Sequence, residues 1–272
     1  MRERAPRTGV LGRCASRNNS LATRVGACEP PWVLDDHFAA EVAARYDDTL
    51  GAMGSREVLG PTVDLLAGLA ALEMAVGTGR IALPLAARGV PVSGIELSPD
   101  MVAQLRAKRG GDAIAVTIGD MTTTRVEGAF RLVYLLYNTI GNVETQDRQV
   151  GCFANAATHL EPGGCFVIEN VVPDLRRLVP GHDAIVFAYA PGYVGYDHND
   201  DLVAQHAGSH HFVADGSGAR EVRTPFRYVW PSELDLMAKL SGLELADRWA
   251  DWDRSPFTGD SPSHVSVWRK QP

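Results

Sequence analysis

The stretch LEMAVGTGRIALPLAARG, residues 72–89, constrains the fold most strongly. It begins as a short apolar run, turns through Gly77-Thr78-Gly79 and continues with apolar residues at helical spacing. Glycine adopts left-handed backbone conformations with little strain, so the chain can turn tightly from a buried strand into a helix. Such a turn also lets a ligand approach the helix N-terminus. The stretch therefore predicts a strand, a ligand-binding turn and a helix.

The same alternation of apolar strands and amphipathic helices continues to about residue 170. Strands separated by helices of this length indicate parallel βαβ units with right-handed crossovers. The pattern therefore predicts an α/β fold with a doubly wound sheet of seven strands. The predicted strands are residues 71–76, 90–97, 113–120, 130–138, 165–170, 243–252 and 263–270, and the predicted helices include 98–110, 147–160 and 231–242.

Composition divides the chain into three parts. Residues 1–34 are rich in arginine and lack the apolar core of a secretory signal, so we expect a disordered or over-annotated segment. Residues 35–272 carry the regular pattern and are predicted to form the main domain. Within it, residues from about 172 to 230 contain β-rich runs broken by Asp-Gly and Gly turns, which predicts an antiparallel insertion.

Charge and hydropathy narrow the classes of partner. The formal net charge is −7, which argues against nucleic acid, because binding to a phosphate backbone depends on Lys and Arg. No run of about 18 apolar residues exists, which excludes a transmembrane helix. We therefore expect a cytoplasmic protein with a small-molecule partner and no membrane association. The sequence leaves open whether it is a monomer or a homodimer.

The cysteines and histidines do not predict a metal site. The four cysteines are scattered and form no CxxC pair. His210 and His211 are adjacent, so on a strand they point to opposite faces and cannot share one ion.

The glycine turn alone leaves two types of cofactor open. Gly77-Thr78-Gly79-Arg80-Ile81-Ala82 fits the loose G-x-G-x-x-G/A pattern of dinucleotide-binding domains, with the acidic Glu96 further along the chain. A nicotinamide-dependent oxidoreductase is therefore one alternative, although no Tyr-x-x-x-Lys pair is present. A cofactor-binding regulatory protein without turnover is another, because no residue in the sequence establishes a catalytic base.

The segments around the turn resemble a known family. Glu73 lies four residues before Gly77 in an E-x-x-x-G-x-G pattern, SGIELSPDMV carries Glu96 at a strand end, and IGDM carries Asp120. LEPGGCFVIEN and the final strand SHVSVWRK complete the series. Together they resemble the ordered motifs of class I S-adenosylmethionine-dependent methyltransferases, whose last strand is antiparallel. Ala75 stands where that family usually has its first glycine.

The resemblance implies S-adenosyl-L-methionine as cofactor and S-adenosyl-L-homocysteine as product. One carboxylate can accept both hydroxyls of a ribose, which suits Glu96, and Asp120 can accept from the adenine amine. Met101 and Met121 are apolar and adaptable enough to flank the purine ring, although a plain core role is an equal alternative. The residues implied to bind the cofactor are Tyr46, Glu73, Ala75, Gly77, Gly79, Glu96, Leu97, Met101, Gly119, Asp120, Met121, Tyr137 and Asn138.

The general pattern is similar to bacterial aminosugar N-methyltransferases. This similarity implies methyl transfer to nitrogen or oxygen of a small-molecule metabolite. Tyr46, Asn142 and His210 are the candidate catalytic residues, and Asn142, Glu169 and Asn170 are the candidate acceptor-binding residues. Some members of that group carry His where this chain has Asn142. For His210, a solvated or structural role is the main alternative.

Overall fold

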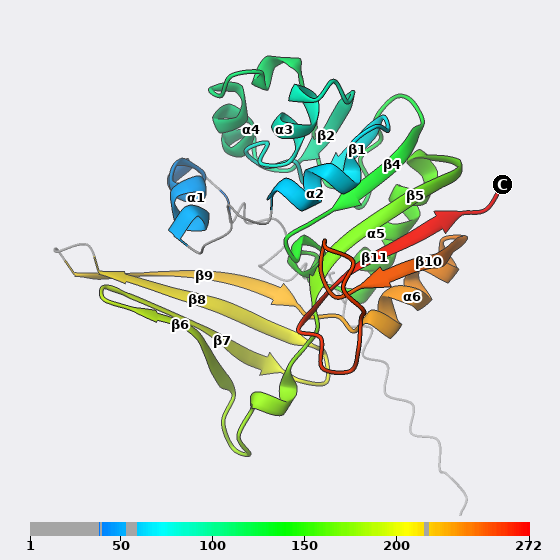
Figure 1. The fold of residues 1–272 in the computed structure, drawn as a ribbon. Coiled ribbons are helices and arrows are strands. Elements are labelled where there is room, and N and C mark those ends of the chain that lie inside the picture. The colour runs from blue at the N-terminus through cyan, green and yellow to red at the C-terminus, as the bar shows by residue number, and fades with distance from the viewer. Residues whose placement is uncertain (1–37, 39, 53–58, 215–217) are drawn as a thin grey trace, which may run out of the picture. The chain divides into compact units, whose positions relative to one another are not determined.

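A seven-stranded sheet forms the centre of the described chain, with the order β10-β11-β5-β4-β1-β2-β3 (Figure 1). The computed structural model describes residues 38–272 except 39, 53–58 and 215–217, so the predicted segment 1–34 lies outside the described residues. β11 runs antiparallel to both neighbours, whereas the pairs among β1 to β5 are parallel. The predicted α/β sheet with an antiparallel last strand is confirmed. Its strands are β1 Ala71–Met74, β2 Val92–Glu96, β3 Ala115–Ile118, β4 Phe130–Leu135, β5 Leu160–Val171, β10 Leu243–Trp249 and β11 Ser263–Lys270.

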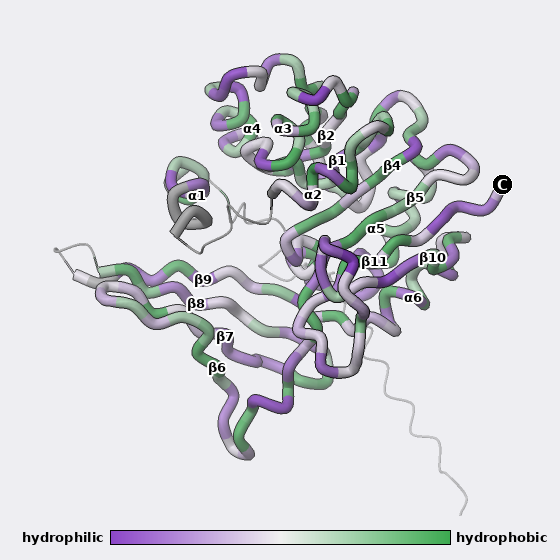
Figure 2. The backbone as a smooth tube through the Cα atoms, in the orientation of Figure 1, coloured by the Kyte–Doolittle hydropathy of each residue, from purple (hydrophilic) through white to green (hydrophobic). Residues whose placement is uncertain are grey.

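Helices cover both faces of this sheet and enclose two apolar cores. Leucines of α2 and α3 pack on one face, and Phe153 of α5 packs with Trp268 and residues of α6 on the other. Successive residues of β4 point into alternate cores, so the central strands are apolar over most of their length (Figure 2). The helices are α1 Ala40–Ala52, α2 Leu59–Leu66, α3 Ala82–Ala87, α4 Pro99–Arg106, α5 Gln146–His159 and α6 Pro231–Leu240, with short 3-10 turns at Gly111–Ala113, Thr139–Asn142 and Leu175–Arg177. No helix in the described ranges has the length and apolar character needed to cross a membrane.

Caps define where the helices of the main sheet begin. The Ser98 hydroxyl accepts from the Met101 N–H at the start of α4, as the sequence predicts for a helix cap. The Thr145 hydroxyl accepts from the Arg148 N–H at the start of α5. These caps place the first turns of α4 and α5 beside the ends of the parallel strands.

The β-rich insertion forms a separate antiparallel sheet with the order β6-β7-β8-β9 (Figure 1). All its pairings are antiparallel, within the predicted range. Unlike the central strands, its strands mix polar and apolar residues (Figure 2). They are β6 Ala184–Ala190, β7 Tyr193–Asp201, β8 His206–Ala214 and β9 Ala219–Arg227.

A buried arginine connects this four-stranded sheet to the main fold. Arg227 ends β9 and is only 4% exposed. Its guanidinium donates to Gln149 of α5 at 2.5 Å, to Gln205 at 2.8 Å and to the Glu233 carboxylate of α6 at 2.7 Å. A buried charge with this many partners is stabilising only while all of them are present. Arg227 is therefore one of the polar contacts that attach the sheet, together with Gln205 and His206.

Arg227→Met should lower the free energy of unfolding by roughly 3 kcal/mol, because it removes a buried cation and leaves the half-buried Glu233 carboxylate without it. The measurement is urea unfolding at constant pH. Arg223→Met is the matched control, since Arg223 lies on the same strand in an exposed ion pair with Asp200 and should change the free energy by about 1 kcal/mol or less. Equal losses in the two variants would contradict this assignment.

Candidate active site

The turn between β1 and α3 is built from left-handed backbone conformations. Gly77 has a φ of 54° and Gly79 a φ of 79°. A Cβ on Gly79 would lie only 3.0 Å from side-chain atoms of Leu83 and Leu105, so that position also needs a glycine for packing. Ala75 has a φ of 61°, a conformation that strains a residue with a side chain. The departure from glycine at this position therefore adds strain directly at the turn.

Glu96 holds this turn against the end of β2. Its Oε2 accepts from the Gly77 N–H at 2.7 Å, and its Oε1 accepts from the Ser98 N–H at 2.9 Å. The carboxylate is 6% exposed and lies at the carboxyl end of its strand. In open α/β sheets, ligands bind beyond this end of the strands. The predicted ribose-binding carboxylate therefore lies where a ligand of the turn would contact it.

Asp120 follows β3 and forms an ion pair that the sequence did not reveal. Its carboxylate accepts from the Thr122 N–H at 2.8 Å and from Arg148 of α5 at 2.7 Å. Burial opposes ionisation, but the hydrogen bonds from Thr122 and Arg148 outweigh it and hold the pKa of Asp120 below its ordinary value. Asp120 is therefore a carboxylate near neutral pH. No motif in the sequence indicates Arg148. The one general expectation is that a half-buried acid such as Asp120 has a polar partner.

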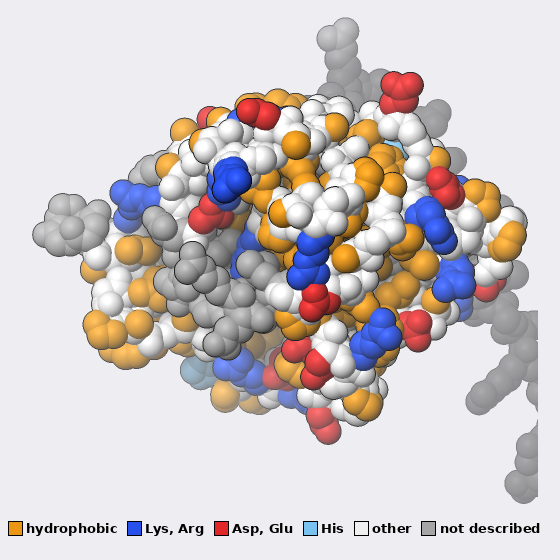
Figure 3. Space-filling view, turned by 45° about the horizontal axis from the view of Figure 1, so that its top comes forward, with side chains coloured by type: hydrophobic (Ala, Val, Ile, Leu, Met, Phe, Trp, Pro, Cys, Tyr) orange, Lys and Arg blue, Asp and Glu red, His pale blue; other side chains and the backbone are white. Residues whose placement is uncertain are grey.

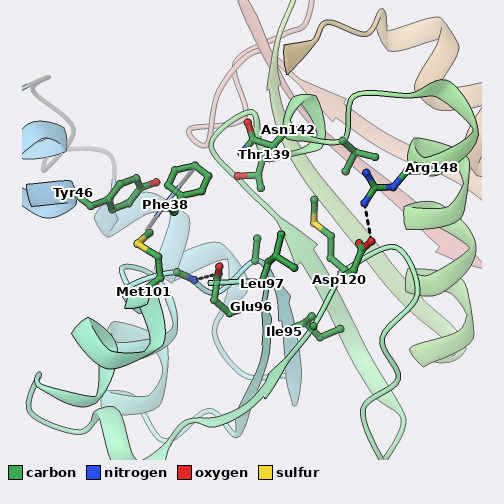
Figure 4. A pocket seen from close by; sticks show the side chains of 15 residues that line it. Phe38, Tyr46, Ile95, Glu96, Leu97, Met101, Asp120, Thr139, Asn142 and Arg148 are labelled. Carbon is green, nitrogen blue, oxygen red and sulfur yellow. Dashed lines mark hydrogen bonds and ion pairs between the residues drawn. The ribbon is translucent and has the colours of Figure 1, made fainter. Parts of the chain in front are cut away.

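A cavity of about 130 Å³ lies between these residues (Figure 4). Phe38 and Tyr46 lie on one side of it and the Asp120–Arg148 pair on the other, with Met101 and Glu96 below the two rings. The predicted cofactor residues that line it are Tyr46, Ala75, Gly77, Glu96, Leu97, Met101, Gly119, Asp120 and Met121, and the predicted acceptor residue Asn142 joins them. Sequence analysis did not single out Phe38, Ile95, Thr139, Val143 or Arg148, which complete the lining.

Four predicted cofactor residues do not line this cavity: Glu73, Gly79, Tyr137 and Asn138. Glu73 is buried in β1 and accepts from the Tyr134 hydroxyl at 3.0 Å. Burial raises the pKa of Glu73 to about 8, although hydrogen bonds from Tyr134 and the Ala82 backbone act in the opposite direction. The folded protein therefore holds a proton on Glu73 at neutral pH.

Glu73 should make stability depend on pH. The unfolded chain loses this proton near the ordinary pKa of 4.5 and the folded chain near a pKa of about 8, so stability falls as pH rises between these values. Burial lowers the pKa of His264 from 6.5 to about 4, so its opposite contribution has ended above pH 6.5. Between pH 6.5 and 8, the wild type should lose roughly 2 kcal/mol relative to Glu73→Gln.

The measurement is the free energy of unfolding of both proteins, without cofactor, at pH 6.5, 7.2 and 8.0, a range chosen from the two pKa values. Gln can still accept from Tyr134 but does not ionise. Parallel curves for the two proteins would show that Glu73 does not titrate in this range.

Tyr46 of α1 and Phe38, which precedes this helix, form an aromatic pair beside the cavity. The rings of Phe38 and Tyr46 meet edge to face, with centroids 5.8 Å apart. Asp47 accepts from the Thr78 hydroxyl at 2.7 Å and pairs with Lys108 at 2.5 Å, which links α1 to the glycine turn and to the region after α4. Burial raises the pKa of the Tyr46 phenol, so Tyr46 is neutral at physiological pH.

A second, larger cavity of about 420 Å³ adjoins the first. Its wall combines α1, the segment after β4, the end of β5 and one face of the four-stranded sheet. The predicted residues Tyr137, Asn138, Asn142 and Asn170 line it. Phe38, Tyr46, Thr139 and Asn142 line both cavities, and these four residues are called the shared wall below.

The turn after β4 is strained where it meets the larger cavity. Tyr137 and Asn138 both have left-handed backbone conformations, with φ values of 56° and 58°. The Glu169 carboxylate accepts from the Tyr137 N–H at 3.2 Å, and Asn138 Oδ1 accepts from the Val171 N–H at 2.6 Å. Burial raises the pKa of Glu169. Glu169 itself lines neither cavity. It acts on the larger cavity only through its hydrogen bond to Tyr137, which lines that cavity.

The structure does not bring His210 to either cavity. Its Nδ1 lies 2.6 Å from the Glu221 carboxylate, and its ring stacks on Tyr196 with centroids 4.7 Å apart. The adjacent His211 lines the larger cavity, as expected for neighbours on one strand. The predicted opposite orientation of the two histidines holds, but the candidate catalytic residue, His210, is the one that lies away from the cavity.

Comparisons with known proteins agree with this arrangement. Residues 71–164 match the family described as "Methyltransferase domain". The CcbJ methyltransferase from Streptomyces caelestis is 34% identical, with a TM-score of 0.76 over 87% of this chain and 98% of that chain. CalS10, an amino pentose methyltransferase from Micromonospora echinaspora solved with S-adenosylmethionine, shares the fold at a TM-score of 0.62 and 21% identity, over 83% of this chain and 96% of that chain.

A curated relative matches over a shorter region. The dTDP-3-amino-3,4,6-trideoxy-alpha-D-glucopyranose N,N-dimethyltransferase of Streptomyces venezuelae is 35% identical over 98 residues. The match covers 36% of this chain and 40% of that protein, so this chain spans less than half the length of this curated relative.

Proposed function

Since the chain belongs to the S-adenosylmethionine-dependent methyltransferase family, we propose that it transfers a methyl group to nitrogen of a small-molecule acceptor. The observation that carries the proposal is the shared wall, through which a cofactor-side cavity and an acceptor-side cavity adjoin. Methyl transfer is an in-line displacement, so catalysis depends on holding donor and acceptor on one line. The relatives whose printed names state an atom or a substrate act on nitrogen or on amino sugars.

The residues of the smaller cavity fit S-adenosylmethionine. Its two acids suit the two ends of an adenosine: Glu96 the ribose diol and Asp120 the adenine amine. Met101 and Met121 provide apolar surface for the purine, and the glycine turn leaves backbone groups accessible to the amino-acid end. The bound cofactor supplies an electrophilic methyl group on a sulfonium.

The shared wall favours nitrogen over oxygen as the acceptor atom. Its polar groups are a phenol, a hydroxyl and an amide, from Tyr46, Thr139 and Asn142. Because burial raises the pKa of Tyr46, this phenol is a hydrogen-bonding group and not a base near pH 7. A neutral amine can attack with its lone pair and lose its proton afterwards, whereas an alcohol needs a base early. The larger cavity then has to orient the amine and exclude water.

The test is transfer of labelled methyl from S-adenosylmethionine to a panel of amines and alcohols matched in size. We expect amines to be methylated and the matched alcohols to remain unmodified. Labelling of alcohols alone would contradict the nitrogen assignment. Failure of every acceptor, together with S-adenosylhomocysteine binding, would support a cofactor-binding protein without turnover.

Glu96→Gln should weaken S-adenosylhomocysteine binding by about 1.5 to 3 kcal/mol, or roughly 10- to 150-fold, because a charged acceptor of the ribose hydroxyls becomes a neutral amide. Titration calorimetry measures this change. Glu127→Gln is the control, since Glu127 is exposed and lines neither cavity. Unchanged affinity in Glu96→Gln would refute the placement of the ribose.

We also propose that this enzyme is cytoplasmic and acts on a small molecule, with no nucleic-acid or membrane partner. The net charge of −7 supports this. On the face that Figure 3 shows, positive and negative side chains alternate among the described residues. A nucleic-acid surface concentrates positive charge instead.

A further inference from the structure

The inner face of the four-stranded sheet carries a polar cluster in the larger cavity. Tyr193 and Asp197 of β7 and Ser209 and His211 of β8 line the cavity together. Asp197 lies opposite Ser209 in the strand register, and the Ser209 hydroxyl donates to its Oδ1 at 2.5 Å. The Tyr193 hydroxyl lies 2.7 Å from His211 Nδ1. These four residues are called the far cluster below. They lie on β7 and β8, whereas no residue of the shared wall lies in the four-stranded sheet.

Asp197 differs from Asp120, the other half-buried acid of the two cavities, because no Lys or Arg among the described residues forms an ion pair with it. Asp120 pairs with Arg148 at 2.7 Å, whereas the hydrogen bond to Asp197 in the described structure comes from neutral Ser209. Burial raises the pKa of Asp197, and the charges that oppose this shift come from the imidazoles of His211 and His210. A carboxylate removed from water without a cation is unfavourable, so a cationic ligand group at its Oδ2 would stabilise it.

The far cluster lies on a different part of the larger cavity from Asn142 of the shared wall. Gly141 lies beside Asn142 of the shared wall, and a Cβ built on it would lie 3.7 Å from Phe226 Cβ. Thr224 lies two residues from Phe226 on β9. It pairs with Ser209 of β8, which pairs with Asp197 of β7. Strand spacing and rise put the Cα atoms of Asp197 and Phe226 roughly 12 Å apart. Asp197 therefore faces a second group of an acceptor whose reacting atom is at the shared wall.

The arginines of the cavity wall do not remove this local negative site. Arg220 lies opposite Val213 in the strand register, four residues from Thr224 along β9. Its Cα is therefore roughly 13 Å from that of Thr224, on the side away from Phe226. Arg45 comes from α1, and Arg227 is paired with Glu233. None of these guanidinium groups contributes to the pKa shift of Asp197. Among the described residues that line the larger cavity, Asp197 is the one acidic side chain.

We propose that Asp197 binds a positively charged amino group of the acceptor, remote from the nitrogen that is methylated. The proposal rests on the proposed function and deepens it by naming the acceptor class, compounds with two basic nitrogens separated by roughly 12 Å. The nitrogen at the shared wall must be neutral to attack, whereas the nitrogen at Asp197 remains an ammonium. Ser209 holds the carboxylate in position by occupying its other oxygen.

The first test measures binding without turnover. The probe is the linear diamine with eight methylene groups between its nitrogens, compared with the monoamine and the amino alcohol of the same chain length. Each is titrated by calorimetry into the protein saturated with S-adenosylhomocysteine. The diamine should bind about tenfold or more tightly than both controls, and Asp197→Asn should remove that preference. Asp200→Asn is the matched control, because Asp200 lies on the same strand and lines neither cavity.

Three results would overturn the proposal. The diamine and the monoamine could bind equally, Asp197→Asn could keep the preference, or the amino alcohol could match the diamine. The last result would mean that Asp197 accepts from a neutral hydroxyl. Unchanged S-adenosylhomocysteine affinity in Asp197→Asn verifies that this variant is folded.

The second test separates this proposal from the proposed function. Labelled methyl transfer to the same diamine and monoamine is measured in the wild type and in Asp197→Asn. If binding depends on Asp197 but no amine is methylated, the proposed function fails and the cation site stands. If both amines are methylated with equal efficiency in both proteins, the cation site fails and the proposed function stands.

Discussion

The bidentate hydrogen bonding of Glu96 is the constraint on which the cofactor side depends. One carboxylate accepts backbone N–H groups from the glycine turn after β1 and from the cap of α4 after β2. A charged acceptor forms stronger hydrogen bonds than a neutral one. The Glu96 carboxylate therefore fixes the distance between the glycine turn and the start of α4. Gly77 and Met101 keep their places on the cavity wall through this link. An acid at the end of the second strand thus organises the site before any ligand binds.

The sequence predicts those parts of the site that follow directly from local patterns. Apolar runs and glycine turns locate the strand ends, and residues at strand ends, such as Glu96 and Asp120, lie where parallel sheets bind ligands. Arg148 and Phe38 enter the same cavity from a helix and from the segment before α1, where no local pattern indicates a ligand. Their positions depend on packing between distant elements, which a single sequence does not encode in a short motif.

The histidine pair shows a second limit of sequence reasoning. Alternation along a strand establishes that His210 and His211 face opposite sides, but only the strand register and the attachment of the sheet decide which side is inward. That attachment rests in part on Arg227, which reaches α5 and α6 through Gln149 and Glu233. No sequence motif links Arg227 to Gln149 or to Glu233, so the sequence does not reveal these contacts. His210 is therefore the wrong member of the pair to place in the cavity. Which histidine faces inward depends on how the sheet is attached, and the chemistry of two adjacent histidines does not reveal this.

Three of the five described non-glycine residues with left-handed backbone conformations lie where the two cavities meet the main sheet. Ala75, Tyr137 and Asn138 carry side chains yet have left-handed backbone conformations, and each lines one of the cavities. Such residues persist only where their surroundings determine the conformation, which Glu169 does for Tyr137 through its hydrogen bond. A rigid wall suits a reaction that depends on alignment more than on proton transfer, because a small displacement of the acceptor lowers the rate strongly. The strained turns thus supply the positioning that the neutral groups of the shared wall cannot supply by acid–base chemistry.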